Sequence, residues 1–156
     1  MRKTSPRLIV ATCLVVFLTG FGGDSFSQEA KRDTLVGDDL HYLGYVMLSG
    51  DTSAWVNMKS DDFYHLSKAM FFRAPKVLSY IKNDDLYFLG AALIYGDDSE
   101  LEKIVQDDFY YLGKAIFSKQ ISVLENIKSD DVYYLGKGLI KKDANYLDQM
   151  STQTKK

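Results

Sequence analysis

Asp107–Phe117 reads DDFYYLGKAIF, and close variants of this phrase occur four more times at a constant spacing. Asp-Asp pairs stand at 38–39, 61–62, 84–85, 107–108 and 130–131, each 23 residues after the one before. Self-similarity at a fixed period is the signature of a repeat architecture. The sequence therefore predicts five tandem repeats over residues 38–152, whose positions are numbered 1 to 23 from the first Asp.

The first half of each repeat has the pattern of an amphipathic helix. Position 6 is leucine in all five repeats, position 7 is glycine in four and Ser67 in the other, and positions 3 and 10 are apolar. These positions share one helical face, which we expect to face the second helix of the same repeat. The first Asp is predicted to cap the helix and the second to face its positive end. A calcium site is disfavoured because no repeat has the Gly-containing, multi-acid loop of an EF-hand.

The second half of each repeat keeps apolar residues three positions apart. Position 18 is leucine except for Trp55, and position 21 is Met58, Ile81, Ile104, Ile127 and Met150. Turn residues such as Ser49-Gly50-Asp51 separate the halves, so we expect hairpins of about ten plus eight helical residues. The glycines at position 7 would let the two helices of one hairpin approach closely. Such hairpins are too small to bury their own apolar faces, so the sequence predicts an all-α fold, an α-solenoid of five stacked repeats.

The phrase Tyr110-Tyr111-Leu112-Gly113-Lys114-Ala115 resembles the first helix of Sel1-like and tetratricopeptide (TPR) repeats, which also place Leu-Gly before a small residue. The repeats of those families are about 34 to 40 residues long, against 23 here. The resemblance covers some eight residues of each repeat and implies a short Sel1/TPR-like array of helical hairpins.

Residues 1–27 have the pattern of a signal peptide. A basic start is followed by an apolar run from Leu8 to Leu18, which is short for a membrane span. Ser25-Phe26-Ser27 predicts cleavage after Ser27, with Gly22 as an earlier alternative and an uncleaved anchor as another. Cys13 lies inside the apolar run, where lipidation is disfavoured. We therefore expect a periplasmic or secreted protein, in contact with a membrane only through the signal segment before cleavage.

The chain that remains after cleavage has no cysteine, so disulfides, thiol nucleophiles and thiolate metal sites are excluded from it. It carries 16 basic against 20 acidic residues, which argues against nucleic acid as a partner. Residues 28–37 would form a capping segment in which Leu35 takes position 21 of a preceding half-repeat. Residues 153–156 would form a polar tail at the end of Ser151–Lys156.

An aromatic row at position 5, flanked by lysines at position 8, is the candidate partner-binding surface. Both positions are expected to point away from the second helix, and tyrosine offers contact area at low entropic cost. Stacked helices would extend this surface over about 40 to 50 Å. The alternative is that superhelical curvature buries the row. The candidate residues are Tyr42, His65, Phe88, Tyr111 and Tyr134 at position 5, Tyr45, Lys68, Lys114 and Lys137 at position 8, and Tyr95 at position 12.

Enzymatic chemistry is not expected, because the prominent features recur five times whereas catalytic groups are singular. His41 and His65 occupy different positions of the repeat, and Asp62–His65 is the one acid–imidazole pair worth naming. Neither a metal nor a cofactor is predicted. We expect a protein-binding module of the adaptor or inhibitor type, whose acidic third repeat could steer a basic partner. The alternatives are a secreted virulence-type or structural factor that self-associates through free solenoid ends, and a glycan-binding module.

Overall fold

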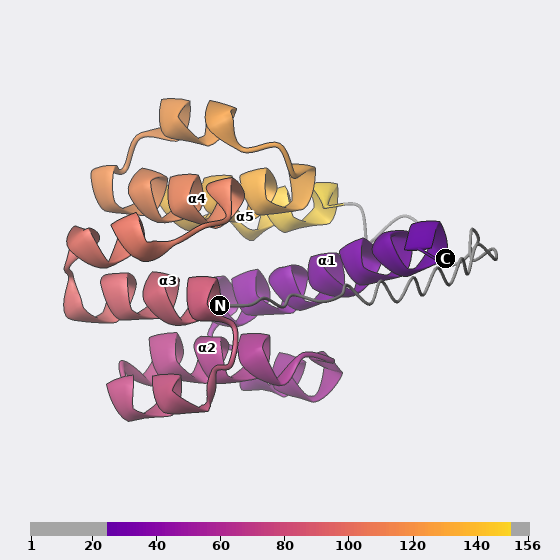
Figure 1. Ribbon diagram of the computed structural model, residues 1–156, viewed down its shortest axis with the longest axis horizontal. Helices are drawn as coiled ribbons and strands as arrows, with labels where there is room; N and C mark the ends of the chain where they lie inside the picture. Colours follow the sequence, from indigo (N-terminus) through magenta and orange to yellow (C-terminus); the bar gives the residue numbers. More distant parts are fainter. Residues whose placement is uncertain (1–24, 151–156) are drawn as a thin grey trace, which may run out of the picture.

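The computed structural model describes the backbone of residues 25–150 and the side chains of residues 37–150. The predicted signal segment before Ser25, with Cys13, and the polar tail lie outside the described residues. The described chain is all-helical, and each repeat contributes an α-helix and a shorter 3-10 helix (Figure 1). In chain order the helices are α1 Ser25–Ser49, η1 Thr52–Asn57, α2 Asp61–Phe72, η2 Pro75–Tyr80, α3 Asp84–Tyr95, η3 Asp98–Lys103, α4 Asp107–Ser118, η4 Ile121–Asn126, α5 Asp130–Lys141 and η5 Ala144–Gln149.

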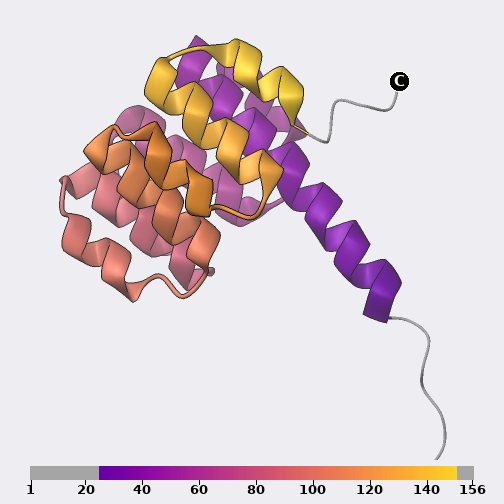
Figure 2. The ribbon, with the colours of Figure 1, turned by 90° about the horizontal axis from the view of Figure 1, so that it is seen from above.

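Helix α1 differs from the other α-helices because it runs without a break from Ser25 through the segment predicted as a separate cap. Its N-terminal part projects beyond the rest of the molecule (Figure 2). No helix of the described chain is both long and apolar enough to cross a bilayer.

Helices α2 to α5 begin one residue earlier in the repeat than the Asp pair suggested, whereas the first Asp pair lies within α1. The N-cap is the residue before the pair, and the side chains of Ser60, Asn83 and Ser129 each accept the N–H of the third helical residue. The predicted capping role of the first Asp is therefore wrong. In α2 to α5 both aspartates lie in the first turn, where their charge is favourable against the helix dipole.

The second element of each repeat is a six-residue 3-10 helix rather than the eight-residue helix that we expected. A 3-10 helix has three residues per turn, so residues three apart lie on the same face. Position 21 is the residue just after the 3-10 helix, and its backbone N–H donates to the carbonyl of position 18, so the spacing of three corresponds to the last turn. Position 18 is almost fully buried in four repeats, as Leu78, Leu101, Leu124 and Leu147.

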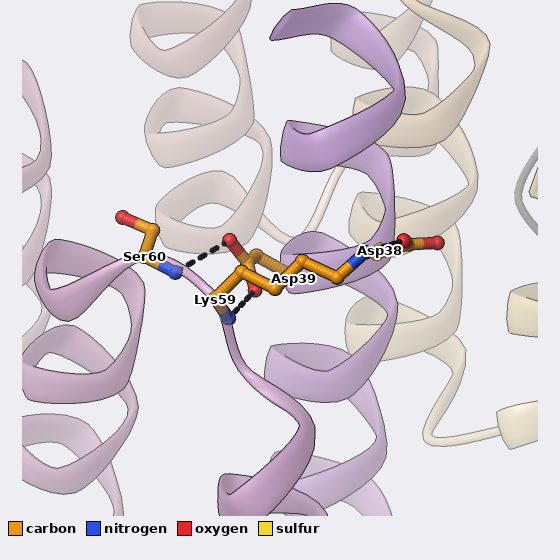
Figure 3. Close-up of polar contacts among 4 residues, drawn as sticks. All are labelled: Asp38, Asp39, Lys59 and Ser60. Atoms are coloured by element: carbon orange, nitrogen blue, oxygen red, sulfur yellow. Dashed lines mark hydrogen bonds and ion pairs between the residues drawn. The ribbon is translucent and has the colours of Figure 1, made fainter. Parts of the chain in front are cut away.

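The second Asp of the first four pairs joins neighbouring repeats, which is a role that the sequence reading missed. The Asp39 carboxylate accepts the N–H of Lys59 at 2.7 Å and that of Ser60 at 3.0 Å, just before α2 begins (Figure 3). Asp62, Asp85 and Asp108 hold the start of the next helix in the same way. We call this two-bond contact the clasp. Each clasp ties one α-helix to the N-terminus of the next α-helix along the chain.

The array of repeats closes on itself. Helix α1 packs against both α2 and α5, and η5 packs on α5 and α1 as η2 packs on α2 and α3 (Figure 2). Gly44 of the first repeat faces Leu135 and Leu147 of the fifth. The five α-helices thus form a ring with the 3-10 helices packed between them. An open solenoid with two free ends, which the sequence suggested, is not what the described residues form.

The glycines at position 7 make the ring tight. A Cβ on Gly113 would lie 2.4 Å from Leu101 Cδ2 and 3.2 Å from Leu89 Cδ1, and both leucines belong to the preceding repeat. The close approach is therefore between neighbouring repeats, and the prediction that it lies within one hairpin is wrong. Positions 6, 7 and 10 accordingly face the neighbouring helices and the inside of the ring.

Candidate functional site

The predicted aromatic row at position 5 is half-buried in all five repeats. His65 stacks on Tyr80 of η2 with ring centroids 5.2 Å apart, and Lys103 of η3 lies 5.3 Å from the centroid of Phe88. These side chains therefore lie beside the 3-10 helix of their own repeat rather than pointing away from it. The ring also bends the row around its circumference, so Tyr42, Tyr111 and Tyr134 do not form one straight strip with the other two.

The predicted lysines at position 8 pair with the tyrosines at position 4. The Nζ atoms of Lys68, Lys114 and Lys137 lie 4.7, 5.5 and 5.4 Å from the ring centroids of the tyrosines four residues earlier. Lys114 also forms an ion pair with Glu102 at 3.0 Å, and this hydrogen-bonded contact raises the pKa of Lys114. The lysines thus belong to local cation–π pairs along the helices and are only partly available to a partner.

Two of the ten predicted residues are exposed. The side chain of Tyr45 is 38% exposed and that of Tyr95 is 63% exposed. In the third repeat, the position equivalent to Tyr45 is occupied by Ala91, which is buried. The ten residues are therefore spread over the ring: five lie half-buried at position 5, three are lysines paired with tyrosines, and two are exposed tyrosines. They do not form one continuous site.

A pocket of about 610 Å³ lies at the end of the ring where α2 to α5 begin. Its floor is made by the position-3 side chains of all five repeats, and Phe63 meets Phe109 edge-on across the ring at 6.4 Å. Its rim is polar and includes Asn83, Gln106 and Asp130. An apolar floor under a polar rim can hold a small ligand, but the floor residues are almost fully buried by one another.

The acidic groups of the described chain do not gather into a metal site. No group of three or more His, Cys, Asp or Glu residues in residues 37–150 is placed to hold an ion. In the acid–imidazole pair, the Asp62 carboxylate accepts the backbone N–H groups of Lys82 and Asn83. This carboxylate is thus engaged in a clasp.

Sequence reasoning missed a group of aromatic side chains where the first and second repeats meet. Trp55 lies 5.7 to 6.2 Å, between ring centroids, from the three aromatic side chains Tyr64, Phe71 and Phe72. We call these four residues the aromatic patch. The sequence marks this junction when equivalent positions of the five repeats, here called columns, are compared. Trp55 is the one residue at position 18 that is not leucine, and Ser67 is the one residue at position 7 that is not glycine.

Comparison of the chain with protein-family models, curated proteins and solved structures returned no significant match. The class that the fold defines is therefore stated from the structure alone, as an all-helical protein of repeated helix-turn-helix units.

Proposed function

We propose that the chain is an exported, non-enzymatic protein-binding module, an adaptor or an inhibitor-type protein that works outside the cytoplasm. The observation that carries the proposal is the uneven distribution of exposed apolar side chains. All eight large hydrophobic residues that are exposed in the described chain lie in the first three repeats, namely Tyr45, Val56, Phe71, Phe72, Tyr80, Tyr87, Tyr95 and Val105.

The fourth and fifth repeats are the internal reference for this observation. They have the same backbone, yet position 12 is Ser118 and Lys141 there, where the second and third repeats have Phe72 and Tyr95. The architecture therefore does not require an aromatic residue at this position. Exposed apolar side chains gathered on one part of a surface are typical of a protein–protein interaction site.

The repeat supplies the variants for the test. In the double variant Phe72→Ser, Tyr95→Ser each aromatic residue is replaced by the residue that the fourth repeat carries, and Lys141→Ser is the matched control. We expect the tagged full chain to capture a partner from the cell-envelope fraction, and the double variant to retain less than about a tenth of it. Equal capture by all three, with unchanged melting temperatures, would reject a binding role for these repeats.

Self-association is the competing proposal. The end faces that an open array would use contact each other through α1 and α5, so association would need another surface or an opened ring. Light scattering over a wide range of protein concentrations tests it. A monomer at every concentration is the result that our proposal expects.

A further inference from the structure

The repeat pattern breaks once, where the first repeat meets the second. A Cβ at position 7 of the other repeats would lie within 2.4 to 2.8 Å of a leucine methyl group. Ser67 is tolerated there because Trp55 replaces the leucine, and the indole Nε1–H donates to Ser67 Oγ at 2.8 Å. The two departures compensate each other, so the tryptophan is accommodated at this junction without disturbing the ring.

Trp55 makes this junction richer in aromatic side chains than the others, which have leucine at position 18 and at most two aromatic residues among positions 4, 11 and 12. Phe71 and Phe72 are 36% and 58% exposed, and both contact Trp55. The equivalents of Phe72 are Ser49, Tyr95, Ser118 and Lys141. Rings held by edge contacts with one another present a rigid apolar surface, which lowers the entropic cost of binding.

A lysine without an acidic partner lies on this surface. Lys68 Nζ lies 5.5 Å from the centroid of Trp55 and donates to Tyr64 Oη at 2.9 Å. At the junction of the third and fourth repeats, the equivalent Lys114 forms its ion pair with Glu102. Glu102 is position 19 of the third repeat, and in the first repeat this position is Val56. No carboxylate of residues 37–150 forms an ion pair with Lys68.

The second repeat, which contributes three of the four patch residues, carries a net charge of the same sign as Lys68. The second repeat has four basic residues against two acidic ones, and one of the acidic residues, Asp62, is engaged in a clasp. Arg73 follows Phe72 directly and is exposed, as is Lys76. An incoming carboxylate would therefore meet cations and aromatic rings together.

We propose that the aromatic patch and Lys68 bind an acidic segment of a partner protein that carries an aromatic or aliphatic side chain next to a carboxylate. The apolar side chain packs on Phe71 and Phe72, and the carboxylate accepts a hydrogen bond from Lys68 Nζ. Arg73 and Lys76 add attraction for further acidic residues of the segment. The proposal rests on the protein-binding function and names its site and the chemistry of its partner.

Trp55 is the only tryptophan of the chain, so its fluorescence reports directly on the patch. The probes are a tryptophan-free peptide of alternating Glu and Phe or Leu, and the same peptide with Lys in place of Glu. We expect a saturable change of Trp55 emission with the acidic peptide and about tenfold weaker binding of the basic one. Equal responses to both peptides, or no saturable response to the acidic one, would overturn the proposal.

The variant Val56→Glu gives the first junction the acidic residue of the third, and Glu102→Val is its mirror-image control. We expect Val56→Glu to weaken the acidic peptide about tenfold at an unchanged melting temperature, and Glu102→Val to leave the affinity unchanged. Equal affinities of wild type and Val56→Glu would overturn the assignment of Lys68. A dimer that Val56→Glu abolishes would make a second copy the occupant and would also overturn it.

Capture of a cellular partner separates this proposal from the broader one. If Val56→Glu leaves capture intact while Phe72→Ser, Tyr95→Ser abolishes it, the acidic-segment proposal fails and the binding function stands. If neither variant changes capture, both proposals fail.

Discussion

Replacing Gly44 by alanine distinguishes a closed ring from an open array by the sign of the stability change. A Cβ on Gly44 would lie 2.7 Å from Leu147 Cδ2 and 2.8 Å from Leu135 Cδ1, and both leucines are fully buried. Overpacking of a filled core costs about 1 to 3 kcal/mol, and two leucines must move here. Alanine recovers about 1 kcal/mol of helix propensity. Because two leucines must move, we expect the overpacking cost in the upper part of that range, about 2 to 3 kcal/mol, which leaves a net loss of about 1 to 2 kcal/mol.

In an open array, Gly44 would face no neighbour, and the same substitution would stabilise the protein by about 1 kcal/mol. Gly90→Ala is the matched control, because a Cβ there meets Leu78 at 2.7 Å and Leu66 at 2.8 Å across an interface that exists in either architecture. Urea unfolding gives both free energies from midpoints at a common m-value. Similar losses in the two variants agree with the ring. A gain for Gly44→Ala beside a loss for Gly90→Ala would refute it.

Three further predictions concern the clasp, the irregular junction and pH. Asp85→Ala removes a clasp and should lower the free energy of unfolding by about 1 to 3 kcal/mol. Asp84 is exposed and forms no clasp, so Asp84→Ala should lower it by less than about 1 kcal/mol, as urea unfolding of both variants would show. Trp55→Leu and Ser67→Gly should each destabilise, whereas the double variant should restore the regular packing, giving a coupling energy of about 1 kcal/mol or more in a double-mutant cycle; additive losses would contradict compensation. Burial raises the pKa of Asp39, so the folded state binds its proton more tightly than the unfolded state. Relative to Asp39→Asn, wild type should therefore gain stability as the pH falls from 7 through that pKa, as measured by urea titrations at several pH values.

The all-helical repeat architecture was predictable because its signals are local. The 23-residue period and the apolar positions of the first helix fix the α-helices, and the spacing of three in the second half is the period of a 3-10 helix. The predicted starts of α2 to α5 were one residue late because an Asp pair is compatible both with a side-chain cap and with acidic residues in the first turn.

Closure and the clasp were not predictable in the same way. A ring of five requires about 72° of rotation per repeat, which depends on how deeply position 18 packs into the next repeat. The clasp joins Asp39 to backbone groups 20 and 21 residues later. The carboxylate has an equally reasonable local role at its own helix end, so the sequence offers no reason to look so far along the chain.

The candidate site was predicted only in its residue types. Aromatic residues and lysines were identified, but the i, i+4 pairing of Lys114 with Tyr110 shows that position 4 rather than position 5 is the partner of the lysines. Trp55 and Ser67 are each the single exception in their column of the repeat, position 18 and position 7, so the sequence marks both residues as unusual. The sequence does not show that these columns meet, since that contact is between repeats.

The most direct test of the ring is a contact across the closure, observed by nuclear Overhauser effects in the isotope-labelled full chain. A glycine α-proton occupies the direction of the absent Cβ, so Gly44 Hα should lie next to the Leu147 δ-methyl groups, 103 residues away in the sequence. The equivalent contact between Gly90 and Leu78 is the internal reference. We predict cross-peaks of similar intensity for both pairs. A clear Gly90–Leu78 cross-peak without one between Gly44 and Leu147 would contradict closure.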